Sequence, residues 1–141
     1  MEIKRILQIL LGIVILLLCL WLAQPWLAYN ADCAPKIQWI KQKYNDYNAL
    51  WFNGQLPNVQ IVWIFDSNYK ARTEHFPPDR FKMSFNPVYN TSETDTEFHL
   101  LHEMCHLKTW KQIGLFDDAH SAPWQVCMKD LAARGAFENV W

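Results

Sequence analysis

The stretch TDTEFHLLHEMCHL, residues 94–107, decides how this sequence folds. Thr94 and Glu97 have the T-x-x-E spacing of a capping box, in which two side chains bind the free backbone N–H groups at the start of a helix. Gly114 provides a matching stop signal. The sequence therefore predicts a long helix that begins at this box and ends at Gly114.

This predicted helix carries the motif HEMCH, which begins at His102 and ends at His106. Residues i and i+4 lie on the same face of a helix, so the two imidazoles can bind one metal ion. Glu103 is rotated by about 100° from His102, and its carboxylate can reach a metal-bound water without binding the metal itself. The alternative is a pair of surface histidines on an ordinary amphipathic helix.

A catalytic zinc site needs a third protein ligand and a fourth position that is open to water. His120 follows His106 by 14 residues, in the loop after the helix, and can fold back over the metal. His99 lies nearly two turns from His106, which is too far, while His75 and Glu138 are more remote candidates. The predicted metal ligands are therefore His102, His106 and His120. For His120 the alternative is a helix-entry histidine on a solvated turn.

The other segments predict an α+β domain around this helix. Apolar residues from Ile37 to Trp51 recur three and four positions apart, which indicates a helix. Segments rich in β-branched or alternating apolar residues predict strands. The predicted elements are, in chain order, a helix over 35–52, a strand over 59–65, a polar loop over 66–80 with room for a short strand, a strand over 81–85, the HEMCH helix, and a last helix from Pro123.

The N-terminal part contains the apolar run ILQILLGIVILLLCLWLA, residues 6–23. As a helix the run would measure about 27 Å, close to the roughly 30 Å of the hydrocarbon core of a bilayer. We therefore predict a membrane anchor and short linker over 1–34, followed by a catalytic domain over 35–141. Lys4 and Arg5 favour a single-pass protein of the bacterial inner membrane with its domain outside the cytoplasm, whereas Lys36, Lys41 and Lys43, which follow the run, favour the opposite orientation. A cleaved signal peptide and a buried helix are the alternatives.

Charge and cysteine content narrow the function classes. The net charge of −1 offers no broad attraction to phosphates, so we expect no nucleic-acid partner; no oligomeric state is predicted. Cys19 lies in the apolar run, and Cys105 is expected to face the core rather than the metal. Cys33 and Cys127 either pair in an oxidising compartment or remain free thiols.

Several motifs resemble those of the SprT-like zinc metalloprotease domains, a family of HExxH zincins, over about residues 36–135. The segment YNDYNALWFNGQLPNVQIVW, residues 44–63, is similar to the family's helix, turn and first strand. FKMSFNP, residues 81–87, resembles its strand before the active-site helix, and LLHEMCHL, residues 100–107, resembles that helix. HSAPW, residues 120–124, resembles the H-G-x-x-W element that carries the third zinc ligand, with Ser121 in place of the usual glycine.

The resemblance implies a small zincin-like domain with a short, mostly antiparallel sheet. It also implies zinc-dependent hydrolysis of peptide bonds in a protein or peptide substrate. His102, His106 and His120 would bind Zn²⁺, and Glu103 would be the general base for a zinc-activated water. The alternative is a zinc-stabilised, membrane-anchored binding module without catalytic activity.

Further roles are predicted for residues around this motif. Met83–Asn86, if it is an edge strand beside the cleft, would align a substrate by β-augmentation. Trp124 is expected to pack beneath the loop that carries His120. Asp117 and Asp118 either orient a ligand histidine or form a solvated turn. Candidates for stabilising a developing oxyanion are Tyr89, His99 and His75.

Overall fold

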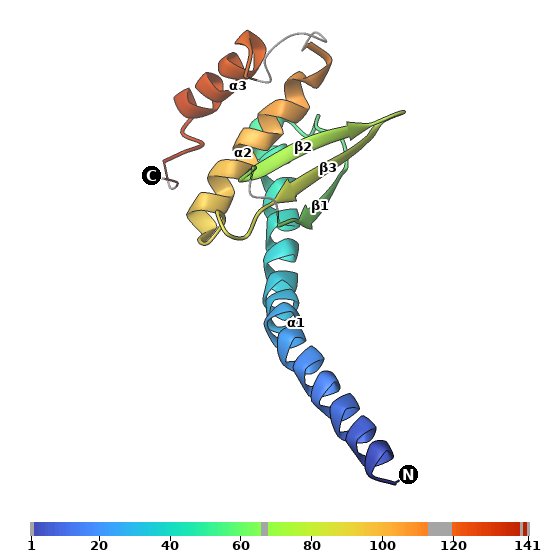
Figure 1. The fold of residues 1–141 in the computed structure, drawn as a ribbon. Coiled ribbons are helices and arrows are strands. Elements are labelled where there is room, and N and C mark those ends of the chain that lie inside the picture. Colours follow the sequence, from blue (N-terminus) through green and yellow to red (C-terminus); the bar gives the residue numbers. More distant parts are fainter. Residues whose placement is uncertain (1, 66–67, 113–119, 139, 141) are drawn as a thin grey trace. The chain divides into compact units, whose positions relative to one another are not determined.

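The computed structural model describes residues 2–65, 68–112, 120–138 and 140 (Figure 1). The chain divides into two compact units, Met1–Lys36 and Ile37–Trp141. The described elements are, in chain order, α1 (Glu2–Phe52), β1 (Val59–Trp63), β2 (Ala71–Phe76), β3 (Arg80–Phe85), α2 (Glu93–Thr109), a 3-10 helix η1 (Trp110–Gln112) and α3 (Ala122–Ala133).

Helix α1 corrects the prediction for the N-terminal segment. Among the residues that the structure describes, no helix is long and apolar enough to cross a membrane. The predicted transmembrane anchor over 6–23, and with it the single-pass inner-membrane location, is therefore wrong. The prediction treated the apolar run as a separate helix closed by a linker over 24–34, whereas α1 continues through those residues to Phe52.

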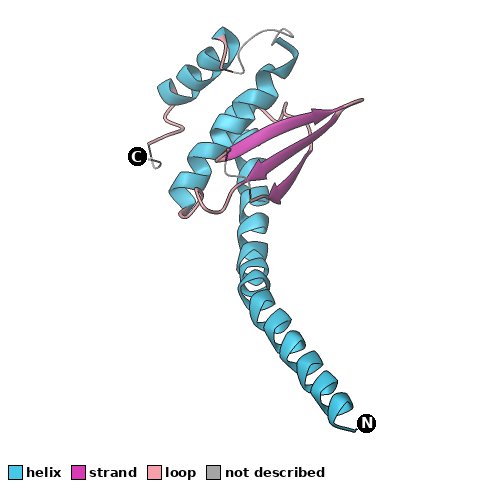
Figure 2. Cartoon of the chain, viewed as in Figure 1, coloured by secondary structure: helices cyan, strands magenta, loops and turns pink. Residues whose placement is uncertain are grey.

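The three strands form one mixed sheet in the order β1-β3-β2 (Figure 2). β1 pairs with β3 in parallel, with Val59 opposite Phe81, while β2 pairs with β3 antiparallel, with Thr73 opposite Met83. The α+β class is confirmed, but the sheet is half parallel rather than mostly antiparallel. Residues 71–76, in the segment predicted as a polar loop with room for a short strand, form a six-residue strand antiparallel to β3, and this return strand lets β3 run parallel to β1.

This arrangement also corrects the predicted edge strand. Met83 and Ser84 belong to β3, which has neighbours on both sides, so Met83–Asn86 cannot present a free edge to a substrate. β2 pairs only with β3 among the described strands and forms the edge of the sheet nearest α2. The edge expected at Met83–Asn86 is therefore found at β2.

Helix α2 lies between β2 of the sheet and α3, and it contacts both. Its buried apolar face joins a core that also includes the end of α1 and the inner faces of β1 and β3. The most deeply buried side chains of this core are Ile40, Met83, Phe85, Leu100, Leu101, Met104 and Leu131. The helix that carries HEMCH is thus held on two sides by packed elements.

The start of α2 differs in detail from the predicted capping box. Ser92 is the N-cap, and its Oγ accepts a hydrogen bond from the backbone N–H of Asp95 at 3.0 Å. The Ser92 hydroxyl in turn donates to the Asp95 carboxylate at 2.7 Å. The box is therefore Ser92–Asp95, two residues earlier than Thr94–Glu97, because Ser92 has the extended backbone that an N-cap requires.

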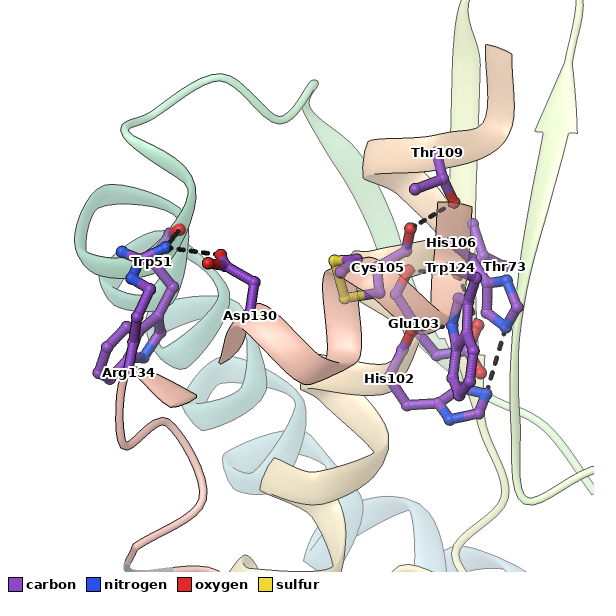
Figure 3. The surroundings of a disulfide bond; sticks show 11 residues. Trp51, Thr73, His102, Glu103, Cys105, His106, Thr109, Trp124, Asp130 and Arg134 are labelled. Atoms are coloured by element: carbon purple, nitrogen blue, oxygen red, sulfur yellow. Dashed lines mark hydrogen bonds and ion pairs between the residues drawn. A yellow bond between two sulfur atoms is a disulfide. The ribbon is translucent and has the colours of Figure 1, made fainter. Parts of the chain in front are cut away.

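Cys105 of α2 and Cys127 of α3 form a disulfide, with their Cα atoms 5.8 Å apart (Figure 3). Both residues are buried, as predicted for Cys105. The predicted option of a Cys33–Cys127 pair is wrong, since α3 packs against α2 and Cys127 is bonded to Cys105.

Candidate metal centre

The three histidines predicted as metal ligands come together in the structure. His102 and His106 lie one turn apart on α2, and His120 lies just before the first residue of α3. The Nε2 atoms of His102 and His106 are 3.2 Å apart, and those of His102 and His120 are 3.1 Å apart. Within the described residues these three side chains form a group whose ligand atoms all lie within 4.8 Å of one another.

The spacing of these nitrogens fits one tetrahedral metal ion. Two imidazole nitrogens bound to zinc at 2.0–2.1 Å with a tetrahedral angle lie about 3.3 Å apart. The observed separations of 3.1 and 3.2 Å are close to that value. The residues present therefore fit a metal held by three imidazoles with one position left open.

Burial and mutual proximity keep the first two imidazoles neutral. Burial, followed by the neighbouring histidines, lowers the pKa of His102 to about 3. Burial and the nearby His120 lower the pKa of His106 to about 4. A metal ligand must offer an unprotonated nitrogen, so both side chains are in the required state at neutral pH without releasing a proton.

Trp124 of α3 contacts all three imidazoles, and Figure 3 shows it beside His102 and His106. Its ring centroid lies 4.7 Å from that of His102, 5.6 Å from that of His106 and 4.5 Å from that of His120. Its indole Nε1 donates a hydrogen bond to the backbone carbonyl of His102 at 3.3 Å. The expected packing of Trp124 near His120 is confirmed, and the hydrogen bond ties α3 to the first turn of the motif.

Glu103 is buried next to the histidines and faces the same cleft. Burial raises the pKa of its carboxyl to about 7, against hydrogen bonds from Thr73 that lower it. The hydroxyl of Thr73 on β2 donates to Glu103 Oε2 at 2.7 Å. A carboxyl group with a pKa near 7 can both take up and release a proton at neutral pH.

The cleft that contains this site has a volume of about 520 Å³ and runs along β2. One end is formed by three aromatic rings in mutual contact: His75 lies 4.1 Å from Trp110 and 4.8 Å from Phe81, centroid to centroid. His75, a candidate for the oxyanion, therefore belongs to the cleft. The residues of β2 that line it are Ala71, Arg72, Thr73, Glu74 and His75.

The other predicted candidates lie elsewhere. His99 Nδ1 forms a hydrogen bond with Asn90 Oδ1 at 2.8 Å, and His99 lines a separate cavity together with Tyr89. Glu138 lines another cavity, beside Phe98. Asp117 and Asp118 lie outside the described residues.

Sequence reasoning missed Thr73 and the hydrogen bond of Trp124. Thr73 lies 30 residues before Glu103, in a segment whose polar residues indicated a loop. The alternation of ARTEHF, with threonine and histidine two positions apart, is the only local signal of an inward face on that strand.

The profile of the SprT-like family matches residues 40–139. No curated protein and no solved structure matches the chain. The family match confirms the resemblance found in the motifs, and it includes the helix, the histidines and the sheet described above. Since it spans more than two thirds of the sequence, the chain belongs to the SprT-like family, whose domains are related to zincin-like metalloproteases.

Proposed function

We propose that this protein is a zinc-dependent metallopeptidase that hydrolyses protein or peptide chains. The observation that carries the proposal is the convergence of three imidazole Nε2 atoms beside a buried carboxyl group in one cleft. A structural zinc site has four protein ligands, whereas a catalytic site has three and an open position. The three-histidine group therefore supports a catalytic rather than a structural role.

A zinc ion bound there would supply a Lewis acid that polarises a carbonyl group and makes a water molecule more acidic. The protein's own residues account for the rest of the reaction. Glu103 takes up a proton from the attacking water and returns it to the leaving amine. In the metal-free protein, burial raises the pKa of Glu103 to about 7, so the carboxyl group can gain or lose a proton near neutral pH.

The edge strand β2 supports an extended polypeptide as the substrate. A strand at the edge of a sheet has backbone N–H and C=O groups that can pair with an added strand. β2 lines the cleft over most of its length, and Thr73 in its middle contacts Glu103. A substrate paired with β2 would thus pass the histidines with its backbone in reach of Glu103.

The test measures metal and activity together in the full chain. Wild-type protein should contain about one zinc per chain and cleave fluorescein-labelled casein. Glu103→Gln should retain zinc and lose hydrolysis by at least about 100-fold, as removal of a general base does. His120→Ala should lose both zinc and activity.

Two control variants carry the same chemical changes away from the cleft. Glu93→Gln changes an exposed carboxylate in the first turn of α2, and His99→Ala changes a histidine of a separate cavity. Both should retain zinc and activity. Zinc-loaded wild type that matches Glu103→Gln on casein and on a fluorogenic peptide library would overturn the proposal in favour of a zinc-stabilised binding module.

A further inference from the structure

Thr73 forms a hydrogen bond with Glu103, and the role of Glu103 as general base does not by itself explain this bond. Its Oγ1 lies 2.7 Å from Glu103 Oε2 and 3.4 Å from the backbone oxygen of the same residue. The threonine hydroxyl donates the hydrogen bond and the carboxyl oxygen accepts it. The carboxyl group of Glu103 also accepts a hydrogen bond from the backbone N–H of Thr73, so one residue of β2 provides both of these bonds.

The position of Thr73 on β2 sets the direction of its side chain. Successive residues of a strand point to opposite faces of the sheet. Glu74, next in the strand, pairs with Lys82 of β3 at 2.7 Å, while Thr73 points to α2. Threonine is β-branched and has few χ1 rotamers, so its hydroxyl is held rigidly by the strand backbone.

The packing around Glu103 leaves its orientation dependent on this contact. The side chain is 4% exposed, and its carboxyl group faces a cleft rather than a packed wall. Without the Thr73 hydroxyl, the carboxyl group keeps the hydrogen bond from the Thr73 backbone N–H, and one bond leaves it freer to rotate than two. The Thr73 hydroxyl limits this movement by holding Oε2 toward β2.

We propose that Thr73 is a positioning residue for Glu103, which fixes the general base against the edge strand that receives the substrate. The inference rests on the proposed peptidase function. Because one strand would hold both the substrate backbone and the hydroxyl that holds the base, the distance between base and scissile bond is set within a single element. Misplacing a reacting group by about 1 Å can lower a rate by about 100-fold.

The kinetic test compares two variants at this position in the full chain. Thr73→Val keeps the branched shape but removes the donor, and should lower kcat on a fluorogenic peptide by about 10- to 100-fold with KM and zinc content unchanged. Thr73→Ser keeps the hydroxyl and should remain within about threefold of wild type. A Thr73→Val enzyme with wild-type kcat, or a Thr73→Ser enzyme as slow as Thr73→Val, would overturn the proposal.

A matched control separates positioning from general destabilisation. Thr96→Val makes the same change at a buried threonine of α2, whose hydroxyl donates to the Ser92 carbonyl at 2.8 Å. It should keep wild-type kcat. In a Glu103→Gln background, Thr73→Val should have no further effect on the residual rate, because the two residues act as one unit. If Thr73→Val lowered the residual rate of Glu103→Gln as strongly as it lowers the rate of wild type, Thr73 would act independently of Glu103, and the proposal would be overturned.

A crystal structure of Thr73→Val decides the positioning independently of catalysis. The Glu103 carboxyl should rotate away from β2 by a change in a side-chain torsion, with the three histidines in place. An unchanged orientation would overturn the proposal. If wild type binds zinc but cleaves nothing, the proposed function fails, and the crystal structure still decides whether Thr73 orients Glu103.

Discussion

Reduction of the Cys105–Cys127 disulfide should lower the free energy of unfolding by about 3 kcal/mol. The bond joins residues 22 positions apart and links α2 to α3. In the chain-entropy model a closed loop of about this length removes roughly 11 cal/mol/K from the unfolded chain, which amounts to about 3 kcal/mol at 25 °C. Reduction returns that entropy to the unfolded state and leaves the packing of the folded state in place.

The expected change in melting temperature follows from the size of the folded unit. The compact unit Ile37–Trp141 contains 105 residues. At about 2.1 cal/mol/K per residue, its entropy of unfolding is about 0.2 kcal/mol/K. A loss of about 3 kcal/mol therefore corresponds to a fall in Tm of about 15 °C.

Thermal unfolding of the full chain, followed by circular dichroism with and without a phosphine reductant, measures this shift. A chelator is present in both samples, so that metal binding does not contribute. The variant Cys127→Ala should melt near the reduced wild type and should not respond to reductant. A fall in Tm of less than about 4 °C in the wild type would show that the cross-link does not restrict the unfolded chain as calculated.

Three further outcomes are expected. In chelator-treated protein, the free energy of unfolding of wild type should fall by about 3 kcal/mol relative to Glu103→Gln as the pH rises from 4.5 to above 7. The pKa of Glu103 is about 7 in the folded state and 4.5 in the unfolded state. The stability that the bound proton contributes is therefore fully present below pH 4.5 and is lost as the pH rises through 7. Urea titrations across this range check it, and parallel pH curves would contradict it. Trp124→Ala should weaken zinc binding by about 10- to 100-fold in a competition titration with a chromophoric chelator, because the indole supports all three imidazoles; equal affinity would contradict this role. Leu101→Ala, at a fully buried position of α2, should cost about 2–5 kcal/mol by urea unfolding, and a loss below about 1 kcal/mol would mean that the site is not packed as described.

Local patterns account for the parts of the structure that were predicted correctly. The relation of His102 to His106 depends only on the 3.6-residue period of a helix, so the motif alone places both imidazoles on one face. The apolar and β-branched residues of the strands at 59–63 and 80–85 made both strands predictable, because at least one face of each is buried. The position of His120 in the loop after the helix, 14 residues past His106, made it the candidate third ligand, and the motif HSAPW agreed with this prediction.

The two main errors, in β2 and in the N-terminal segment, have different causes. β2 has no fully buried residue, so its sequence ARTEHF lacks an apolar pattern and becomes a strand only by pairing with β3. The apolar run over 6–23 has the composition of a membrane anchor, but composition cannot show that the helix continues to Phe52.

The sequence by itself determined the HEMCH helix, the α+β class and the identity of the residues that gather at the candidate metal centre. Only the tertiary structure decided that Cys105 pairs with Cys127, that β2 forms the edge beside the cleft, and that Thr73 meets Glu103. The physical reason is the distance along the sequence between the residues that interact. Helical spacing is set by bonds within a few residues, whereas contacts across 22 or 30 residues depend on which surfaces pack together and in what register.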